Sequence, residues 1–193
     1  MKILVTGATG FVGGYLLKYL REKYPEALLS GTGRNKEKSE LLRKEGYDII
    51  TGDISDPDFV KSSLSEFTHI IHSAARSSIW GKYEEFYRDN VVATRNLMDG
   101  IDQLERFIYI STANIYFNLH DRTDVREDDP LPEKRVSYYP ITKYIAEKEV
   151  LDTKRNIHTI SLRPRGIIGP GDTTSMPRIM RAYKEDKIRI VGD

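Results

Sequence analysis

Tyr139 and Lys143, in the stretch YPITK, are the pair of side chains in this sequence best suited to move a proton. A spacing of four residues places both on one face of a helix. A tyrosine hydroxyl has an ordinary pKa of about 10 and exchanges protons poorly near neutral pH, but a neighbouring ammonium group favours its phenolate form. We therefore predict that Tyr139 is a general acid/base and that Lys143 lowers its pKa.

Spacing alone does not single out this pair. The same pattern occurs at Tyr19 and Lys23, at Tyr144 and Lys148, and at Tyr183 and Lys187. Context favours Tyr139, because it opens a helical pattern after a predicted strand and is followed by Pro140, which suits the first turn of a helix. Its hydroxyl can then face the carboxyl edge of a parallel sheet, where ligands bind.

A second hydroxyl is needed to orient the oxygen of a carbonyl that is reduced or of an alcohol that is oxidised. The stretch STANIY, residues 111–116, follows a predicted strand and offers two hydroxyls. We choose Thr112 first and Ser111 second. The alternative for either residue is a hydrogen bond to the backbone at the end of the strand, which is common for serine and threonine.

The stretch TGATGFVGG, residues 6–14, lies between an apolar run at 3–5 and a helical pattern, so it predicts a strand, a glycine-rich turn and a helix. Gly7, Gly10 and Gly13 allow a tight turn, a close approach of the backbone to phosphate, and close packing of the helix on the strand. The helix N-terminus adds free N–H groups and a partial positive charge. The stretch predicts a site for a dinucleotide pyrophosphate. Because the spacing is GxxGxxG, the alternative is an ordinary strand-to-helix turn.

The end of the second predicted strand bears on the phosphate state of the cofactor. An acidic residue about 20 positions after the glycines would bind a ribose 2′-hydroxyl, but the sequence there is SGTGRNKEK, with Arg34 followed by Lys36 and Lys38. These cations favour a 2′-phosphate, and hence NADP(H), over NAD(H). The alternative is a solvated basic turn with NAD(H) bound through backbone contacts. Asp53, in GDISD, is placed to accept a hydrogen bond from the adenine amino group, or else to cap a helix that begins near Pro57.

Short apolar runs alternate with longer amphipathic ones along the whole chain. We predict strands near residues 2–6, 27–32, 48–52, 69–74, 106–111 and 158–163. We predict helices near residues 11–23, 36–45, 57–65, 83–103 and 139–155. Strands separated by helices pair in parallel through right-handed crossovers, so the expected fold is α/β, a doubly wound parallel sheet of the Rossmann type with strand order 3-2-1-4-5-6. The acidic segment 121–135 is expected to be a long surface loop, either plain or a lid near the site.

Length and composition limit the class of protein. The 193 residues, 39% of them hydrophobic, suit one domain over residues 1–193. The net charge of +1 gives no basic field for nucleic acid or an anionic membrane, and no run approaches the roughly 20 apolar residues of a membrane span. With no cysteine, no room for a signal peptide before the first strand and no metal-binding spacing among its histidines, the chain is expected to be cytoplasmic and to bind no metal.

Taken together, these motifs resemble the extended short-chain dehydrogenase/reductases, also described as the NAD-dependent epimerase/dehydratase family. The resemblance covers essentially the whole chain. The matching stretches, in the order of the family, are TGATGFVGG, GDISD, HSAA at 72–75, NVVATRNL at 90–97, STANIY, YPITK and LRPRGIIGPGD. Two positions depart from the most frequent pattern. Thr112 stands where serine is usual, which keeps the hydroxyl, and Ala93 stands where glycine is usual.

The resemblance implies that Tyr139 is the general acid/base, that Lys143 binds the nicotinamide ribose and lowers the Tyr139 pKa, and that Thr112 orients the reacting oxygen. It implies a nicotinamide cofactor, for which the basic turn favours NADP(H) with NAD(H) as the alternative. The residues expected to bind this cofactor are Gly7, Thr9, Gly10, Phe11, Val12, Gly13, Arg34, Asp53, Ile54, Ser73, Ala74, Ala75, Tyr139, Lys143, Pro164 and Ile167.

Within the family, SSIWGKYEEFYRDNVVATRNL and IIGPGDTTSMPRIMRAYK are similar to the branch of 3β-hydroxysteroid dehydrogenases and related ketone reductases. The expected function is an NAD(P)-dependent oxidoreductase that acts on an apolar, steroid-like secondary alcohol or ketone. The alternatives are a nucleotide-sugar epimerase or dehydratase with retained NAD, and a cofactor-binding sensor or scaffold without turnover. The aromatic side chains Trp80, Tyr83, Phe86 and Tyr87 either form a substrate wall or pack within the helical region.

Members of this family continue well beyond a VGD segment like the one at 191–193, and the region that follows builds much of their substrate pocket. We therefore expect either a truncated chain or a natural short form whose substrate site is incomplete or completed by a partner. By analogy with relatives, helices near 83–103 and 139–155 are expected to form a homodimer contact. A small-molecule substrate is expected, and nucleic acid and membrane partners are not.

Overall fold

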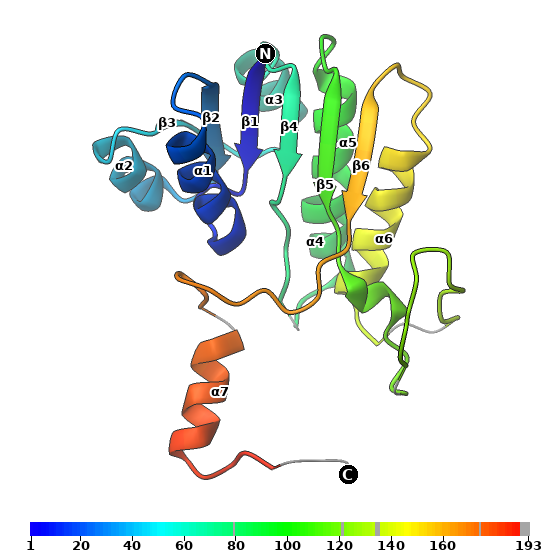
Figure 1. Cartoon of the computed structure of the whole chain (residues 1–193). Helices are drawn as coiled ribbons and strands as arrows, with labels where there is room; N and C mark the ends of the chain where they lie inside the picture. Colours follow the sequence, from blue (N-terminus) through cyan, green and yellow to red (C-terminus); the bar gives the residue numbers. More distant parts are fainter. Residues whose placement is uncertain (79, 121, 134–135, 174, 190–193) are drawn as a thin grey trace.

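The structure is a computed structural model and describes residues 1–78, 80–120, 122–133, 136–173 and 175–189. Its centre is a six-stranded sheet in which all neighbouring strands are parallel (Figure 1). The strands are β1 (Lys2–Thr6), β2 (Leu28–Gly33), β3 (Asp48–Thr51), β4 (His69–His72), β5 (Arg106–Ile110) and β6 (His158–Leu162). Their order, β3-β2-β1-β4-β5-β6, confirms the predicted doubly wound Rossmann sheet.

Helices pack on both faces of this sheet (Figure 1). The helices are α1 (Phe11–Lys23), α2 (Lys36–Lys44), α3 (Pro57–Ser63), α4 (Tyr83–Tyr87), α5 (Ala93–Gly100), α6 (Tyr138–Leu151) and α7 (Ser175–Lys184). On one face α3, α5 and α6 enclose a core that includes Val60, Leu97 and Phe107. On the other face α1 and α2 cover β1, β2 and β3 around Leu17 and Leu29. Each crossover thus buries its apolar stripe against the sheet.

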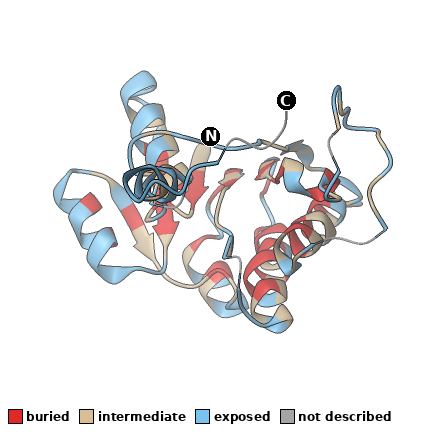
Figure 2. Cartoon of the chain, turned by 90° about the horizontal axis from the view of Figure 1, so that it is seen from below, coloured by how far each residue is buried: buried red, intermediate tan, exposed pale blue. Residues whose placement is uncertain are grey.

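The register of the sheet brings distant motifs to one edge. Thr6, the last residue of β1, lies beside His72, the last residue of β4, and His72 lies beside Tyr109 of β5. Because parallel strands end at the same edge, the turns that follow them are neighbours. Viewed from below, buried residues gather on the strands and on the helix faces turned toward them, and the connecting loops are mostly exposed or intermediate (Figure 2).

The predicted helix 83–103 changes its hydrogen bonding part-way along. Between α4 and α5 lies a π-helical turn, η1 (Arg88–Val92), and α5 ends three residues before the predicted boundary. Turns of this kind are rare and often occur at functional sites. This turn buries Asp89 and Asn90, so a carboxylate enters the interior where the sequence pattern predicted regular helix.

The other differences concern the end of the chain and its longest loop. The helix predicted at 139–155 ends at Leu151, and α7 had no counterpart in the prediction. No residue of α7 is buried. In the acidic segment 121–135 the described residues, 122–133, form neither helix nor strand, as expected. The guanidinium of Arg122 and the backbone N–H of Arg126 both donate hydrogen bonds to Asp129 within that segment, so it is partly ordered by its own polar contacts.

Candidate active site

The glycine turn after β1 forms a backbone cradle that a side chain would fill. Gly7 has a φ of +71°, and a Cβ added to it would lie 2.9 Å from the Cα of Ala74. A Cβ on Gly13 would lie 2.4 Å from the carbonyl oxygen of Gly7. Gly10 caps α1 without any side-chain hydrogen bond, so the N–H groups of the first turn remain available to a ligand. These residues fit the pyrophosphate of a dinucleotide.

A cavity of about 510 Å³ extends from this cradle along the carboxyl edge of the sheet. All the residues predicted to bind a cofactor, together with Thr112, line it. Its β2 end is formed by Arg34, Asn35 and Asp53, and its β5 end by Thr112 and Tyr139 together with Lys143. The volume is in the range of cofactor and ligand sites. The lining residues that sequence analysis did not select are Thr32, Gly33, Asn35, Gly52, Ser77, Asp89, Ala93, Ile110, Arg165 and Thr173.

Tyr139 and Thr112 meet at the β5 end. Tyr139 lies in the first turn of α6, after the cap residue Ser137, and Thr112 follows β5. Thr112 is buried, and its Oγ1 accepts a hydrogen bond from the backbone N–H of Asn114 at 3.2 Å. The predicted strand-end bond to the backbone is therefore present. The hydroxyl proton of Thr112 can still be donated, because that bond uses the oxygen only as an acceptor.

The pKa of Tyr139 is shifted upward, whereas the sequence analysis predicted a downward shift. Burial raises the pKa of Tyr139 above the ordinary tyrosine value, and a hydrogen bond with the Thr112 side chain only partly opposes this shift. The lowering of the Tyr139 pKa by Lys143 stays a prediction. The ammonium nitrogen of Lys143 instead lies over the ring of Tyr109, 3.9 Å from the ring centroid. Desolvation of the phenolate therefore dominates the shift of the Tyr139 pKa.

Lys143 is itself strongly affected by burial. Its side chain is among the largest fully buried ones, and burial lowers its pKa to about 7, against the attraction of Glu147, which raises it. The ammonium group is therefore only partly protonated at neutral pH. A buried lysine that titrates near pH 7 at the edge of a cavity is typical of functional sites.

A buried ion pair lies one helical turn beyond Lys143. Glu147 Oε1 accepts hydrogen bonds from Arg163 Nε at 2.8 Å and Nη2 at 2.5 Å, and Ser111 Oγ donates to Oε2. Arg163 Nη1 also donates to the carbonyl oxygen of Glu127 at 2.8 Å. This network joins the residues next to Thr112, Lys143 and Pro164. Sequence analysis missed it, although Glu147 follows Lys143 by four positions on the same helix.

Asp53 is held at the β2 end by its own turn. Its Oδ1 accepts hydrogen bonds from the backbone N–H and the hydroxyl of Ser55, each at 2.9 Å. Asp53 does not cap α3, because Asp56 does so by accepting from the N–H of Asp58. Although burial acts in the opposite direction, the Ser55 hydrogen bonds and the charge of Arg34 hold the pKa of Asp53 below its ordinary value.

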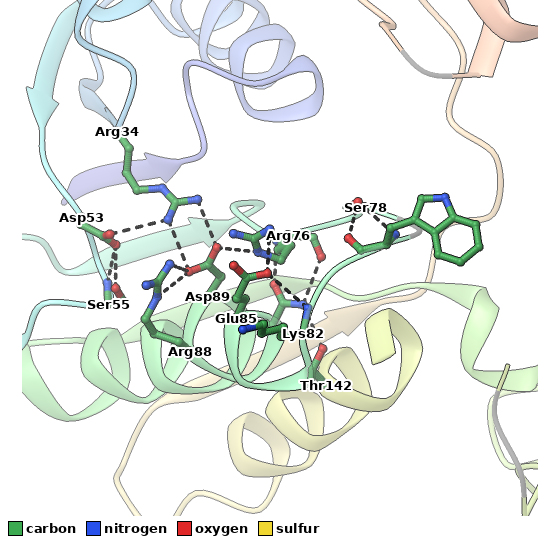
Figure 3. A network of polar contacts seen from close by, with 12 residues as sticks. Arg34, Asp53, Ser55, Arg76, Ser78, Lys82, Glu85, Arg88, Asp89 and Thr142 are labelled. Atoms are coloured by element: carbon green, nitrogen blue, oxygen red, sulfur yellow. Dashed lines mark hydrogen bonds and ion pairs between the residues drawn. The ribbon is translucent and has the colours of Figure 1, made fainter. Parts of the chain in front are cut away.

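Arg34 lines the cavity as predicted, but its surroundings are not purely cationic. Its guanidinium contacts both carboxylate oxygens of Asp89 at 3.3 Å and lies 3.6 Å from Asp53 (Figure 3). Lys36 and Lys38 are exposed in the first turn of α2 and are not among the described residues that line the cavity. Sequence reasoning placed the arginine and missed its acidic partners, because Asp89 is distant in the chain.

The aromatic and histidine residues divide into structural and exposed groups. Phe86 is buried, and its ring and that of Tyr83 pack against Tyr138, whereas Trp80 is 83% exposed. His72 is buried between two threonine hydroxyls, and burial holds its pKa well below the usual range.

Among the described residues no cluster of His, Asp or Glu is suited to a metal, and none of their helices is long and apolar enough to cross a membrane.

Comparison with protein families gives a match over almost the whole chain. The model of the NAD dependent epimerase/dehydratase family matches residues 3–193, which include the glycine cradle, Thr112, Tyr139 and Lys143. The chain belongs to the NAD-dependent epimerase/dehydratase family. This family membership agrees with the doubly wound sheet and with the position of the cavity at its carboxyl edge.

Relatives within the family include named reductases and dehydrogenases. The chain is 32% identical to the 2-alkyl-3-oxoalkanoate reductase of Stenotrophomonas maltophilia, with 100% of this chain and 59% of the relative covered. It is 29% identical to the sterol-4-alpha-carboxylate 3-dehydrogenase of Schizosaccharomyces pombe, with 99% and 57% covered. The chain thus spans less than three fifths of the length of either of these relatives of the family.

A solved structure that is similar to this chain shows the same architecture. The UDP-glucuronic acid 4-epimerase from Bacillus cereus, crystallised in complex with NAD, superposes with a TM-score of 0.77 at 27% identity. The superposition covers 97% of this chain and 64% of that one. The proteins to which this chain is similar therefore include both redox enzymes and an epimerase.

Proposed function

We propose that this protein is an oxidoreductase that prefers NADP(H) and transfers a hydride between the nicotinamide and an apolar secondary alcohol or ketone. The observation that carries the proposal is the convergence of Thr112, Tyr139 and Lys143 on the cavity that the glycine cradle also lines. The family match and the names of the reductase and sterol dehydrogenase relatives support it.

The side chains at the β5 end have distinct roles in this reaction. When bound, the nicotinamide supplies the hydride in reduction and accepts it in oxidation. In reduction Tyr139 donates its hydroxyl proton to the carbonyl oxygen of the substrate, and in oxidation it takes the proton back. Thr112 donates its hydroxyl proton to the same oxygen when substrate is bound, and so fixes the orientation of the substrate. Thr112 is buried and Tyr139 is partly buried, which limits competition from water.

Lys143 provides the hydrogen bonds and the charge that the reaction needs beside Tyr139. In its protonated form it donates to the ribose hydroxyls and stabilises the tyrosinate that remains after proton transfer. An anionic dinucleotide in the cavity raises the pKa of a buried lysine, because opposite charge favours the ammonium form. A larger fraction of Lys143 is therefore protonated with cofactor present than burial, which lowers its pKa to about 7, allows in the structure.

The preference for NADP(H) rests on Arg34. Its side chain is 51% exposed at the β2 end, where it can exchange its contacts with Asp89 and Asp53 for a 2′-phosphate and bind this group through two N–H groups. The preference for an apolar substrate rests on three exposed side chains, of which one precedes Tyr139 and two follow Thr112 by five and seven positions. Tyr138, Phe117 and Leu119 are 46%, 48% and 70% exposed.

A nucleotide-sugar epimerase is the second candidate. The fold likeness to the UDP-glucuronic acid 4-epimerase, at 27% identity, favours it. Such a reaction uses a cofactor that stays bound through the catalytic cycle. Absorbance and mass spectrometry of the purified, then denatured, protein separate the two candidates. Retained NAD in near-stoichiometric amount would favour the epimerase over the reductase.

Binding and turnover together test the proposal. Calorimetric titration of the 193-residue chain with NADPH and with NADH is expected to show tighter binding of NADPH, and Arg34→Ala is expected to remove the difference. Tyr139→Phe is expected to keep NADPH binding and to reduce the rate of NADPH oxidation with a hydrophobic ketone by about 10³-fold. Binding of neither dinucleotide would overturn the oxidoreductase proposal for this chain, and unchanged turnover in Tyr139→Phe would overturn the role of Tyr139.

A further inference from the structure

Asp89, at the β2 end of the cavity, holds three arginines at once (Figure 3). Its side chain is only 3% exposed. Oδ1 accepts from Arg88 Nε at 2.9 Å and Nη2 at 2.8 Å, and Oδ2 accepts from Arg76 Nε at 3.0 Å. The two contacts with Arg34 are the longest, at 3.3 Å each. Arg34 is therefore the most weakly held of the three arginines.

The formal charges around Asp89 cancel. Arg34 also faces Asp53, with Nη1 3.6 Å from Oδ2, and Arg76 also faces Glu85, with Nη1 3.7 Å from Oε2. The three arginines that contact Asp89 are thus matched by three carboxylates. Arg34 is a paired cation and not a free one, so a ligand that needs its charge must compete with Asp89 and Asp53.

We infer that Asp89 is a specificity-determining residue for the cofactor, which reduces the preference for NADPH over NADH by pairing with Arg34. The inference rests on the proposed function, because it requires a nicotinamide dinucleotide in the cavity that Asp89 lines. By this inference Arg34 and Asp89 together determine the choice between the two cofactors, whereas the sequence motif alone assigned that choice to Arg34.

The physical basis is an exchange of partners by Arg34. A 2′-phosphate carries a charge near −2 at neutral pH, so it attracts Arg34 and is repelled by a nearby carboxylate. When Arg34 turns to the phosphate, Asp89 keeps its shorter hydrogen bonds to Arg76 and Arg88 and does not become an unpaired buried charge. A 2′-hydroxyl is neutral and leaves the pairing of Arg34 intact. Asp89 therefore weakens NADPH binding selectively.

Two substitutions test the inference in opposite directions. Asp89→Asn removes the competing charge and is expected to increase the ratio of NADPH to NADH affinity about tenfold. Arg88→Gln removes the tightest partner of Asp89, so Arg34 is held more firmly and the same ratio is expected to fall. Arg88 is 53% exposed, so this variant is expected to fold even if Asp89→Asn does not. Arg95→Gln, which breaks an exposed pair with Glu149 on another surface, is the matched control and is expected to leave the ratio unchanged.

Calorimetry of the four proteins with both dinucleotides gives the ratios, and thermal melts verify folding. A ratio that rises in Asp89→Asn and falls in Arg88→Gln supports the inference. Equal weakening of both cofactors in Asp89→Asn, or a lower ratio, would show that Asp89 merely supports the fold or positions Arg34, and would overturn it. Absence of dinucleotide binding in the unsubstituted chain would instead remove the proposed function, and the inference with it.

Discussion

The two ends of the cavity place a positively charged side chain in opposite environments. At the β5 end Lys143 is fully buried, its nitrogen lies over the ring of Tyr109, and burial lowers its pKa to about 7. At the β2 end Arg34 is half exposed and shares two carboxylates, Asp53 and Asp89. Desolvation thus controls the protonation of Lys143, whereas carboxylate partners control how strongly Arg34 can bind an anion.

This difference matches the chemistry proposed for each end. A buried ammonium group that titrates near neutral pH suits a site where a proton moves. A guanidinium stays charged at all accessible pH values, so it suits recognition of a phosphate, and its strength is adjusted only by its partners. The free energy of unfolding and its pH dependence are therefore expected to depend on the β5 end. The salt dependence of cofactor affinity is expected to depend on the β2 end.

The largest effect on stability is expected from the buried ion pair behind the β5 end. Glu147 is 1% and Arg163 18% exposed in this pair. Glu147→Gln leaves Arg163 without its carboxylate in a desolvated position, which is expected to lower the free energy of unfolding by about 3–5 kcal/mol. Urea denaturation at pH 7 measures this loss.

The matched control is Glu149→Gln, two positions further along α6. Glu149 pairs with Arg95, and the two side chains are 34% and 45% exposed. Because solvent screens such a pair, its loss is expected to cost less than about 1 kcal/mol. Similar losses in the two variants would remove the contrast between buried and exposed charge on which the comparison depends.

A smaller effect is expected from the titration of Lys143. Burial lowers the pKa of Lys143 to about 7 in the folded state, whereas the unfolded chain keeps its proton to about pH 10. The unfolded state therefore binds more protons between these values, and stability rises with pH across this window. Without cofactor, the free energy of unfolding is expected to increase by about 2 kcal/mol from pH 7 to pH 9.

Lys143→Met is expected to abolish this rise and to be the more stable protein at pH 7. Its buried neighbours do not titrate in the same window, because burial holds the pKa of His72 well below 7 and that of Tyr109 well above 10. Denaturation curves at several pH values measure the slope. A slope that persists in Lys143→Met would assign it to other groups and would contradict the view of Lys143 as a desolvated cation.

Sequence analysis identified the site residues that belong to local motifs. It missed the site residues that only tertiary packing brings together. Gly7 and Thr112 each lie directly after or near a strand end, and Tyr139 opens the helix that connects β5 to β6, so the order of the parallel strands sufficed to gather them at one edge. Asp89 pairs with Arg34 across 55 positions and enters the interior on a π-helical turn, which hydrophobic periodicity does not reveal. The direction of the Tyr139 pKa shift also escaped prediction, because burial is a property of the fold.

The smallest effect is expected from salt, and it bears on the β2 end. Raising the ionic strength from about 0.05 to about 0.5 M shortens the Debye length from about 14 to about 4 Å. Screening then weakens the attraction between Arg34 and a 2′-phosphate, so NADPH affinity is expected to fall about threefold more than NADH affinity. Arg34→Ala is expected to make the two salt dependences equal. Equal dependences in the unsubstituted chain would mean that Arg34 remains bound to Asp53 and Asp89 when the cofactor is present, and the NADPH preference would then have to come from another part of the cavity.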